Sequence, residues 1–406
     1  MSASELGIIE GFYGQPWSWG RRQELIDFMA RTGYETYMYA PKFDPYHREC
    51  WRDPYPADIL GHMAALVERG RLRGVEVGMA ISPGLSIGFS EGSDVARLEA
   101  KLATWQAMGV RLFGLLFDDI DRTEPDDVRA RHQAELVNRM ARFVGADTGR
   151  ARLIFCPTDY HGTGDGAYHA TLGKVLLPQV GVYWTGPDVV SVTITAADLA
   201  AVTEHLRRPV ILWDNYPVHD ALDMMRSLHL GPIQGRSGDV VRRAAGSHVN
   251  PMELSVASRV PLRTYRDFWR EPERYDPFAS YRAACRVEAP AIADALILLG
   301  EVAAESQVDH TLEEVAWPDA GSFDAWERAA EAILAAPADG IAGEVAPWAL
   351  KLREVARLGR AVEGGDPEAI RAALERAELD PVSVFRGRIE ARARELLGEE
   401  APARPQ

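Results

Sequence analysis

Three aspartates at the end of an apolar run are the residues of this chain best suited to chemistry. The run 112–117 has the length of a strand and is followed by Asp118, Asp119 and Asp121. Continuous apolar strands are typical of buried parallel sheets, and α/β barrels keep their reactive side chains at the carboxyl ends of such strands. Adjacent carboxylates repel each other, which separates their pKa values and suits acid–base catalysis. A strand followed by a helix cap and solvated acidic residues fits this segment equally well.

The same pattern recurs along the first two thirds of the chain. Short apolar or β-branched runs end in polar, aromatic, Gly or Pro residues at 10–14, 39–42, 155–160, 183–187, 211–215 and 249–251. Segments with apolar residues at helical spacing lie between them, at 21–30, 57–71, 94–108, 128–143 and 196–206. With 246–249 as the last strand, the count reaches eight. This alternation predicts an α/β fold, a (β/α)8 TIM barrel with functional side chains at its strand ends.

The composition changes near residue 270, after which Ala, Glu, Leu and Arg dominate and strand signals are scarce. Helical spacing of apolar residues covers 281–305, 322–335, 341–362 and 367–397. We therefore predict a catalytic barrel at 1–270, an all-α helical bundle domain at 271–397 and a flexible tail at 398–406. Two roles stay open for the bundle: shaping a groove for the leaving group of a substrate, or forming a homodimer.

Charge and composition narrow the function classes. The net charge of −15 over 406 residues argues against nucleic-acid and anionic-membrane partners. The chain has no apolar run of membrane-spanning length and no signal-peptide pattern, so we expect a cytoplasmic protein, although a trimmed signal would leave the same sequence. Cys50, Cys156 and Cys285 match neither a zinc spacing nor a disulfide framework. Without a nucleotide-binding glycine loop or a His cluster, we expect no cofactor and no metal.

Taken together, the strand-end motifs resemble glycoside hydrolase family 84, the O-GlcNAcases and related β-N-acetylglucosaminidases. The matching segments follow the family's order over about residues 7–255: 10–17, 39–42, 47–52, 80–84, 117–121, 155–158, 184–187, 213–215 and 250–251. One departure is Asp159, where the family often has Glu. The resemblance implies a retaining exo-β-N-acetylglucosaminidase acting on a GlcNAc-bearing glycoside or glycoprotein.

By this resemblance, Asp118 and Asp119 correspond to the catalytic pair of a substrate-assisted reaction. The oxygen of the sugar's own 2-acetamido group attacks the anomeric carbon and forms an oxazoline. Asp118 would orient the acetamido N–H, and Asp119 would protonate the leaving oxygen and later deprotonate water. Neighbouring residues of a strand point to opposite faces, so both can face one pocket only if the strand ends or bulges there.

The resemblance also assigns seven sugar contacts. These are Gly11 for close approach of the backbone, Lys42 as a donor to a ring hydroxyl, Tyr160 closing on the acetamido group, Trp213 as a wall of the acetamido pocket, Asn215 and Asp220 for acetamido and hydroxyl groups, and Asn250 for a hydroxyl. Four of these seven also fit ordinary structural roles, as a turn glycine, a surface lysine, a core tryptophan and a turn asparagine.

Three other functions compete with this one. The aspartates could hold magnesium in a metal enzyme. The barrel could be a non-catalytic GlcNAc-binding protein, because a fold does not fix a function. An endo-acting hydrolase of hyaluronan or chitin fragments would share the same residues around the sugar.

Overall fold

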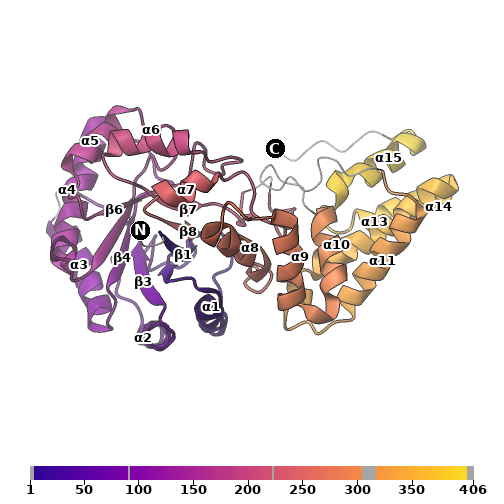
Figure 1. The fold of residues 1–406 in the computed structure, drawn as a ribbon, viewed down its shortest axis with the longest axis horizontal. Helices are drawn as coiled ribbons and strands as arrows, with labels where there is room; N and C mark the ends of the chain where they lie inside the picture. The colour runs from indigo at the N-terminus through magenta and orange to yellow at the C-terminus, as the bar shows by residue number, and fades with distance from the viewer. Residues whose placement is uncertain (1–3, 90–91, 222–223, 304–316, 400–406) are drawn as a thin grey trace. The chain divides into compact units, whose positions relative to one another are not determined.

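The barrel predicted from the strand pattern is confirmed. The computed structural model describes residues 4–89, 92–221, 224–303 and 317–399. Within them, eight parallel strands pair in chain order, and β8 closes the barrel on β1 (Figure 1). The strands are β1 (Glu5–Glu10), β2 (Thr36–Tyr39), β3 (Glu76–Ile81), β4 (Leu112–Leu116), β5 (Arg152–Cys156), β6 (Gly181–Trp184), β7 (Ile211–Asp214) and β8 (Gly246–Val249).

A helix follows each strand, as a βα repeat requires. These helices are α1 (Trp19–Thr32), α2 (Ala57–Arg73), α3 (Gly92–Ala107), α4 (Asp126–Val144), α5 (Ala167–Val175), α6 (Ala196–Leu206), α7 (Gly238–Arg243) and α8 (Arg259–Arg270), with the 3-10 turn η1 (Ala146–Thr148) after α4. Helices α1, α2 and α4 end at glycines in the left-handed conformation, which has no steric cost without a Cβ. Sequence periodicity did not reveal α5 and α7, which are only nine and six residues long.

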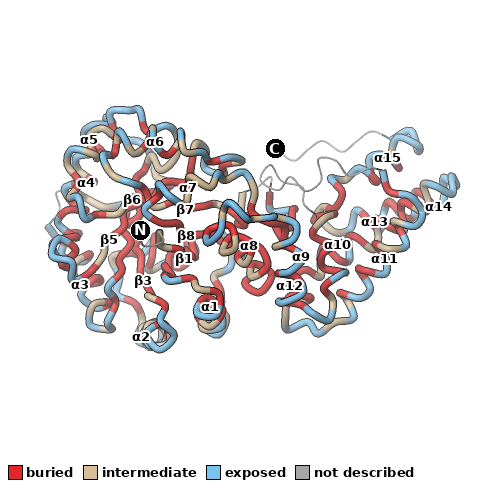
Figure 2. The backbone as a smooth tube through the Cα atoms, viewed as in Figure 1, coloured by how far each residue is buried: buried red, intermediate tan, exposed pale blue. Residues whose placement is uncertain are grey.

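The barrel interior contains a cluster of buried, mostly apolar side chains. The strands are buried along nearly their whole length (Figure 2). One inward-facing cluster contains Ile9, Met38, Ala40, Ala80, Leu112, Leu116, Ile154, Cys156, Tyr183 and Trp213. This closely packed cluster supports the side chains at the ends of the strands.

A polar network lies at the opposite, amino end of the barrel. His248 contacts Glu5 Oε1 and Thr36 Oγ1 through Nε2, each at 2.9 Å, and Tyr183 Oη through Nδ1 at 2.5 Å. Arg152 forms ion pairs with Glu5 and with Glu76. Burial alone would raise the pKa of Glu5, but the hydrogen bond and charge of His248, together with Arg152, lower it to about 2.

The low pKa of Glu5 predicts acid-dependent stability. Its carboxylate stabilises the fold above the unfolded pKa of 4.5, and this contribution is lost as the pH falls toward about 2. The difference between the two pKa values corresponds to about 3 kcal/mol at neutral pH. We expect Glu5→Gln to lower the free energy of unfolding by up to this amount at pH 7 and by much less at pH 3, as measured by urea denaturation.

The matched control for this prediction is Glu99→Gln, which removes a surface ion pair with Arg139 and should not change the pH dependence. A stability difference between Glu5→Gln and the wild-type protein that is equal at pH 7 and pH 3 would show that the carboxylate charge of Glu5 does not matter.

The chain beyond the barrel is helical, as predicted, but its helices are shorter than the sequence suggested. They are α9 (Pro277–Glu288), α10 (Ala293–Ala303), α11 (Ala320–Leu334), α12 (Ile341–Glu344), α13 (Ala346–Gly364), α14 (Pro367–Ala377) and α15 (Arg388–Leu397), with the 3-10 turns η2 (Pro290–Ile292) and η3 (Phe385–Gly387). Three predicted stretches are each broken into two near Pro290, Pro347 and Pro381. Proline lacks an N–H group and restricts the residue before it, so helices stop or restart there.

Two compact units share the chain unevenly. The barrel unit comprises the described residues of 1–218, 235–255 and 266–274, and the helical unit those of 219–234, 256–265 and 275–406. The helical unit also contains two segments that precede residue 270, namely 219–234 and 256–265. A domain boundary at residue 270 therefore stays a prediction. Most of the predicted tail, 400–406, lies outside the described residues. None of the described helices combines the length and apolarity that crossing a membrane needs.

Candidate active site

The strand break that the aspartate pair requires is present after β4. The strand ends at Leu116, Phe117 N donates to Cys156 O at 2.9 Å, and Asp119 has a φ of 54°. A positive φ is uncommon for a residue with a side chain and often marks a functional site. The alternation of side chains between the two faces of the strand therefore ends before Asp118, so the side chains of Asp118 and Asp119 can both face one site.

The buried Arg48 holds the main chain of this pair. Its guanidinium donates to Asp119 O at 2.9 Å and to Ser82 Oγ at 3.2 Å, and it lies 3.5 Å from Asp118 O. Arg48 follows His47, whose Nδ1 lies 2.8 Å from Ala80 O of β3. The sequence motif included Arg48 but gave it no role. The structure makes it the group that fixes the unusual backbone of Asp119.

We expect Arg48→Met to lower kcat about 10- to 100-fold with little change in KM, because it releases the backbone that aims Asp119. Arg48→Lys should recover part of the loss, since it keeps a cation without the fork of donors. Steady-state kinetics and thermal unfolding should be measured on both. The control is Arg52→Met, which removes an arginine that binds Asp94 and Ser86 instead. A lower melting temperature of Arg48→Met with unchanged kcat would reduce Arg48 to a structural residue.

Asp118 is buried in an ion pair. The residue is 5% exposed, and its Oδ2 pairs with Nζ of Lys42, a residue that is also 5% exposed. The pair compensates two buried charges. Lys42 Nζ also lies 5.4 Å from the centre of the Trp213 ring and 5.8 Å from that of Tyr13. The other carboxylate oxygen, Asp118 Oδ1, is buried and has no hydrogen-bond partner among the described residues. Because a buried acceptor without a donor is costly, a ligand N–H group fits this position.

Asp119 lies in a different environment, exposed and held by two tyrosines. Tyr13 donates its hydroxyl to Oδ2 at 2.8 Å and Tyr160 donates to Oδ1 at 2.7 Å. Burial, followed by the charge of Asp119, raises the pKa of both tyrosines well above the usual value, so both hydroxyls keep their protons and donate. Two adjacent carboxylates thus have separate surroundings, which suits separate roles.

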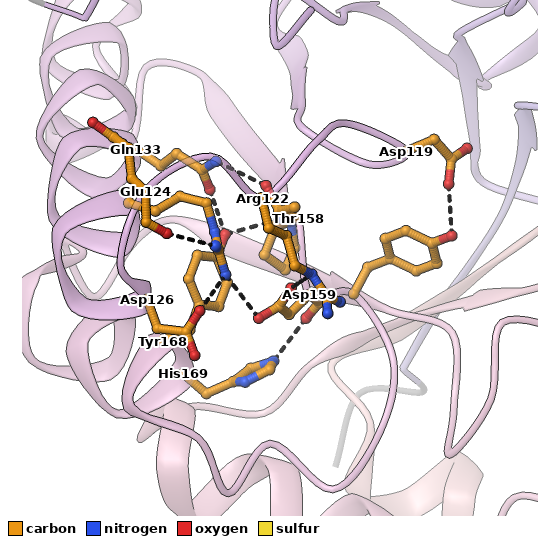
Figure 3. Close-up of polar contacts among 12 residues, drawn as sticks. Asp119, Arg122, Glu124, Asp126, Gln133, Thr158, Asp159, Tyr168 and His169 are labelled. Carbon is orange, nitrogen blue, oxygen red and sulfur yellow. Dashed lines mark hydrogen bonds and ion pairs between the residues drawn. The ribbon is translucent and has the colours of Figure 1, made fainter.

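Thr158 and Asp159, which precede Tyr160, are held by contacts with side chains of α4 and α5 (Figure 3). Asp159 pairs with Arg122 at 2.9 Å and with Arg129 at 3.1 Å, and its carbonyl oxygen lies 2.7 Å from Nε2 of His169. Gln133 donates to Thr158 Oγ1 at 2.8 Å. Asp159, which stands where the family often has Glu, is therefore held by two arginines. This network fixes the position of the adjacent Tyr160.

A second group of the predicted residues forms a wall beside the pair. A Cβ on Gly11 would lie 2.4 Å from Cζ2 of Trp213, so the indole packs directly on this backbone. Gly11 N donates to Asn250 Oδ1 at 3.2 Å, Asn250 Nδ2 donates to Asn215 Oδ1 at 2.9 Å, and Asn215 Nδ2 donates to the carbonyl of Val189 at 2.7 Å. Packing against Trp213 alone explains the glycine.

The structure brings together the predicted site residues that belong to the barrel unit. Asp220 belongs to the helical unit, and its role at the sugar remains a prediction. Asp121 is exposed, and Cys156 is buried in the barrel core, where burial raises its thiol pKa well above the usual value. The described residues contain no group of three or more His, Cys, Asp or Glu side chains placed to hold a metal ion.

Comparisons with known proteins agree with this geometry. Residues 6–301 match the model of the beta-N-acetylglucosaminidase family. Protein O-GlcNAcase of Rattus norvegicus and that of Mus musculus are each 36% identical over 276 residues, which is 65% of this chain but only 30% of theirs. A mutant of the O-GlcNAc hydrolase of Thermobaculum terrenum has a TM-score of 0.87 at 27% identity and covers 97% of this chain and 94% of its own. The chain therefore belongs to the beta-N-acetylglucosaminidase family, glycoside hydrolase family 84.

Proposed function

We propose that this protein is a retaining exo-β-N-acetylglucosaminidase that removes terminal β-linked GlcNAc through an oxazoline intermediate. The observation that carries the proposal is the buried Asp118 Oδ1, which has no hydrogen-bond partner in the described part of the chain and lies beside a second carboxylate in separate surroundings. Family membership supports the same substrate class, and so do the relatives, which are a protein O-GlcNAcase and an O-GlcNAc hydrolase. The substrate that we propose is therefore a GlcNAc-bearing glycoside or glycoprotein.

In the first step, Asp118 Oδ1 accepts a hydrogen bond from the acetamido N–H, which makes the acetamido oxygen a better nucleophile. That oxygen attacks the anomeric carbon while the bond from this carbon to the leaving oxygen breaks. Asp119 transfers its proton to the leaving oxygen. The carboxylate of Asp118, paired with Lys42, would lie beside the developing positive oxazolinium and stabilise it.

In the second step, Asp119 takes a proton from water, the water oxygen attacks the anomeric carbon, and the oxazoline ring opens. Two inversions give a product with retained β configuration. Both oxygens of Asp119 accept tyrosine hydroxyls in the ligand-free arrangement. One hydroxyl must yield when Asp119 acts as the acid, and Tyr13, which is more exposed than Tyr160, can more readily turn to solvent.

The remaining predicted residues would bind the sugar as the resemblance implies. Gly11 would let the backbone approach the sugar closely, and Trp213 would wall the acetamido pocket. The residues that would contact acetamido or hydroxyl groups are Lys42, Tyr160, Asn215, Asp220 and Asn250. The cytoplasmic location and the homodimer stay predictions.

The proposal is tested by product analysis on 4-nitrophenyl glycosides. We expect hydrolysis of the β-N-acetylglucosaminide and no comparable hydrolysis of the β-glucoside, which lacks the nucleophile. Proton NMR of the early reaction should show the β-anomer of GlcNAc first. An α-anomer as first product, or equal rates on both glycosides, would reject the mechanism. Full activity in excess EDTA is expected, whereas loss of activity would favour the magnesium alternative.

A further inference from the structure

Phe43 is an exposed apolar residue between two buried charged residues. Its neighbours Lys42 and Asp44 are 5% and 7% exposed, whereas the phenyl side chain is 58% exposed. Lys42 pairs with Asp118, and Asp44 accepts the hydroxyls of Tyr39 and Tyr55 at 2.8 and 2.9 Å. The backbone is thus fixed on both sides of Phe43. A single exposed apolar residue is common, so its surroundings decide whether it matters.

The Phe43 ring borders the catalytic carboxylate through Tyr13. The two ring centres are 6.1 Å apart at 73°, an edge-to-face contact, and the Tyr13 hydroxyl donates to Asp119. If Asp119 protonates the leaving oxygen, then the group attached to that oxygen, the aglycone, begins beside this aromatic pair. The neighbouring charges of Lys42 and Asp44 are buried and compensated, so neither of them lies at the surface beside the exposed, apolar Phe43 ring.

We propose that Phe43 and Tyr13 form an aglycone subsite that binds the C–H face of a second, uncharged pyranose ring. A pyranose joined directly through the leaving oxygen presents a rigid apolar face at a fixed distance from Asp119. An extended peptide would meet Phe43 only through variable side chains, and a uronic acid would bring a charge to a surface that offers it no counter-charge from Lys42. This inference rests on the proposed function, because it places the aglycone at Asp119.

The test compares kcat/KM for N,N′-diacetylchitobiose and for methyl β-N-acetylglucosaminide, whose leaving group is an alkoxide too small to cover Phe43. We expect Phe43→Ala to lower the ratio of the two values about three- to tenfold, as loss of one ring contact implies. Phe43→Tyr should restore the ratio because it keeps the ring. Leu72→Ala, which shortens an apolar side chain of 66% exposure on α2, is the matched control and should behave as wild type.

The outcomes separate this inference from the proposed function. If the wild-type protein cleaves neither glycoside, the proposed function fails. If it cleaves both and Phe43→Ala leaves the ratio unchanged, the subsite is overturned. A serine peptide carrying O-GlcNAc is the third substrate: a loss of kcat/KM on the peptide but not on the disaccharide would overturn the pyranose in favour of a peptide aglycone.

Discussion

Replacing Asp119 with asparagine should lower kcat/KM about 100- to 10,000-fold for glycosides with poor leaving groups, the range expected when a general acid is lost. Glycosides with good leaving groups should lose much less, because a stable phenolate departs without a proton. Each tenfold loss corresponds to about 1.4 kcal/mol of barrier. Asparagine keeps the size of the side chain and can still accept hydroxyls of Tyr13 and Tyr160, so the site should remain assembled.

The measurement for Asp119 is kcat/KM across a series of aryl β-N-acetylglucosaminides whose phenols differ in pKa. The dependence on the phenol pKa should be steep for Asp119→Asn and shallow for the wild type. Asp121→Asn is the matched control, since Asp121 is an exposed carboxylate two residues away. The same loss for every phenol would reject Asp119 as the acid.

Replacing Asp118 with asparagine should lower kcat about 100- to 1,000-fold, the effect of removing one preorganised electrostatic group. Unlike the Asp119 variant, it should leave the dependence on the phenol pKa unchanged, because proton transfer to the leaving group is intact. The buried Lys42 then lacks its counter-charge. Removing one partner of a buried ion pair costs about 3 to 5 kcal/mol of stability, so rates must be normalised to the folded fraction.

A double variant, Asp118→Asn with Lys42→Met, separates stability from chemistry. It removes the unpaired charge and should regain thermal stability without regaining kcat. Intact mass spectrometry of Asp118→Asn during turnover should show no covalent sugar on the protein, since the nucleophile belongs to the substrate. A glycosyl adduct on any residue would contradict this assignment.

The barrel was predictable because its signal is local. Apolar runs of strand length, each ending in polar or aromatic residues, identify the strands that close the barrel, and the run before Asp118 is the clearest of them. The Ala-rich helical periodicity on both sides of Pro290 and Pro347 predicts one continuous helix across each proline, but in the structure the helices break there. Short helices such as α7 give too few turns for periodicity to register.

The contacts within the site were not predictable, because they depend on distances across the barrel. The ion pair of Lys42 with Asp118 joins residues 76 positions apart, and Tyr13 reaches Asp119 across 106 positions. The packing of the Trp213 indole on the backbone of Gly11 also joins residues far apart in the sequence, while the predicted contact of Gly11 with the sugar stays a prediction. No sequence motif predicts the network of Glu5 and His248 at the amino end of the barrel.

The central claim is that the substrate's own acetamido oxygen is the nucleophile, oriented by Asp118. The most direct test measures kcat/KM for aryl glycosides of glucosamine that carry N-acetyl, N-fluoroacetyl, N-difluoroacetyl and N-trifluoroacetyl groups. Each fluorine weakens the carbonyl oxygen as a nucleophile, so the account predicts a steep, graded fall in kcat/KM across the series. Rates that stay level from the acetyl to the trifluoroacetyl compound would mean that another group attacks the anomeric carbon, and the assignment of Asp118 would be wrong.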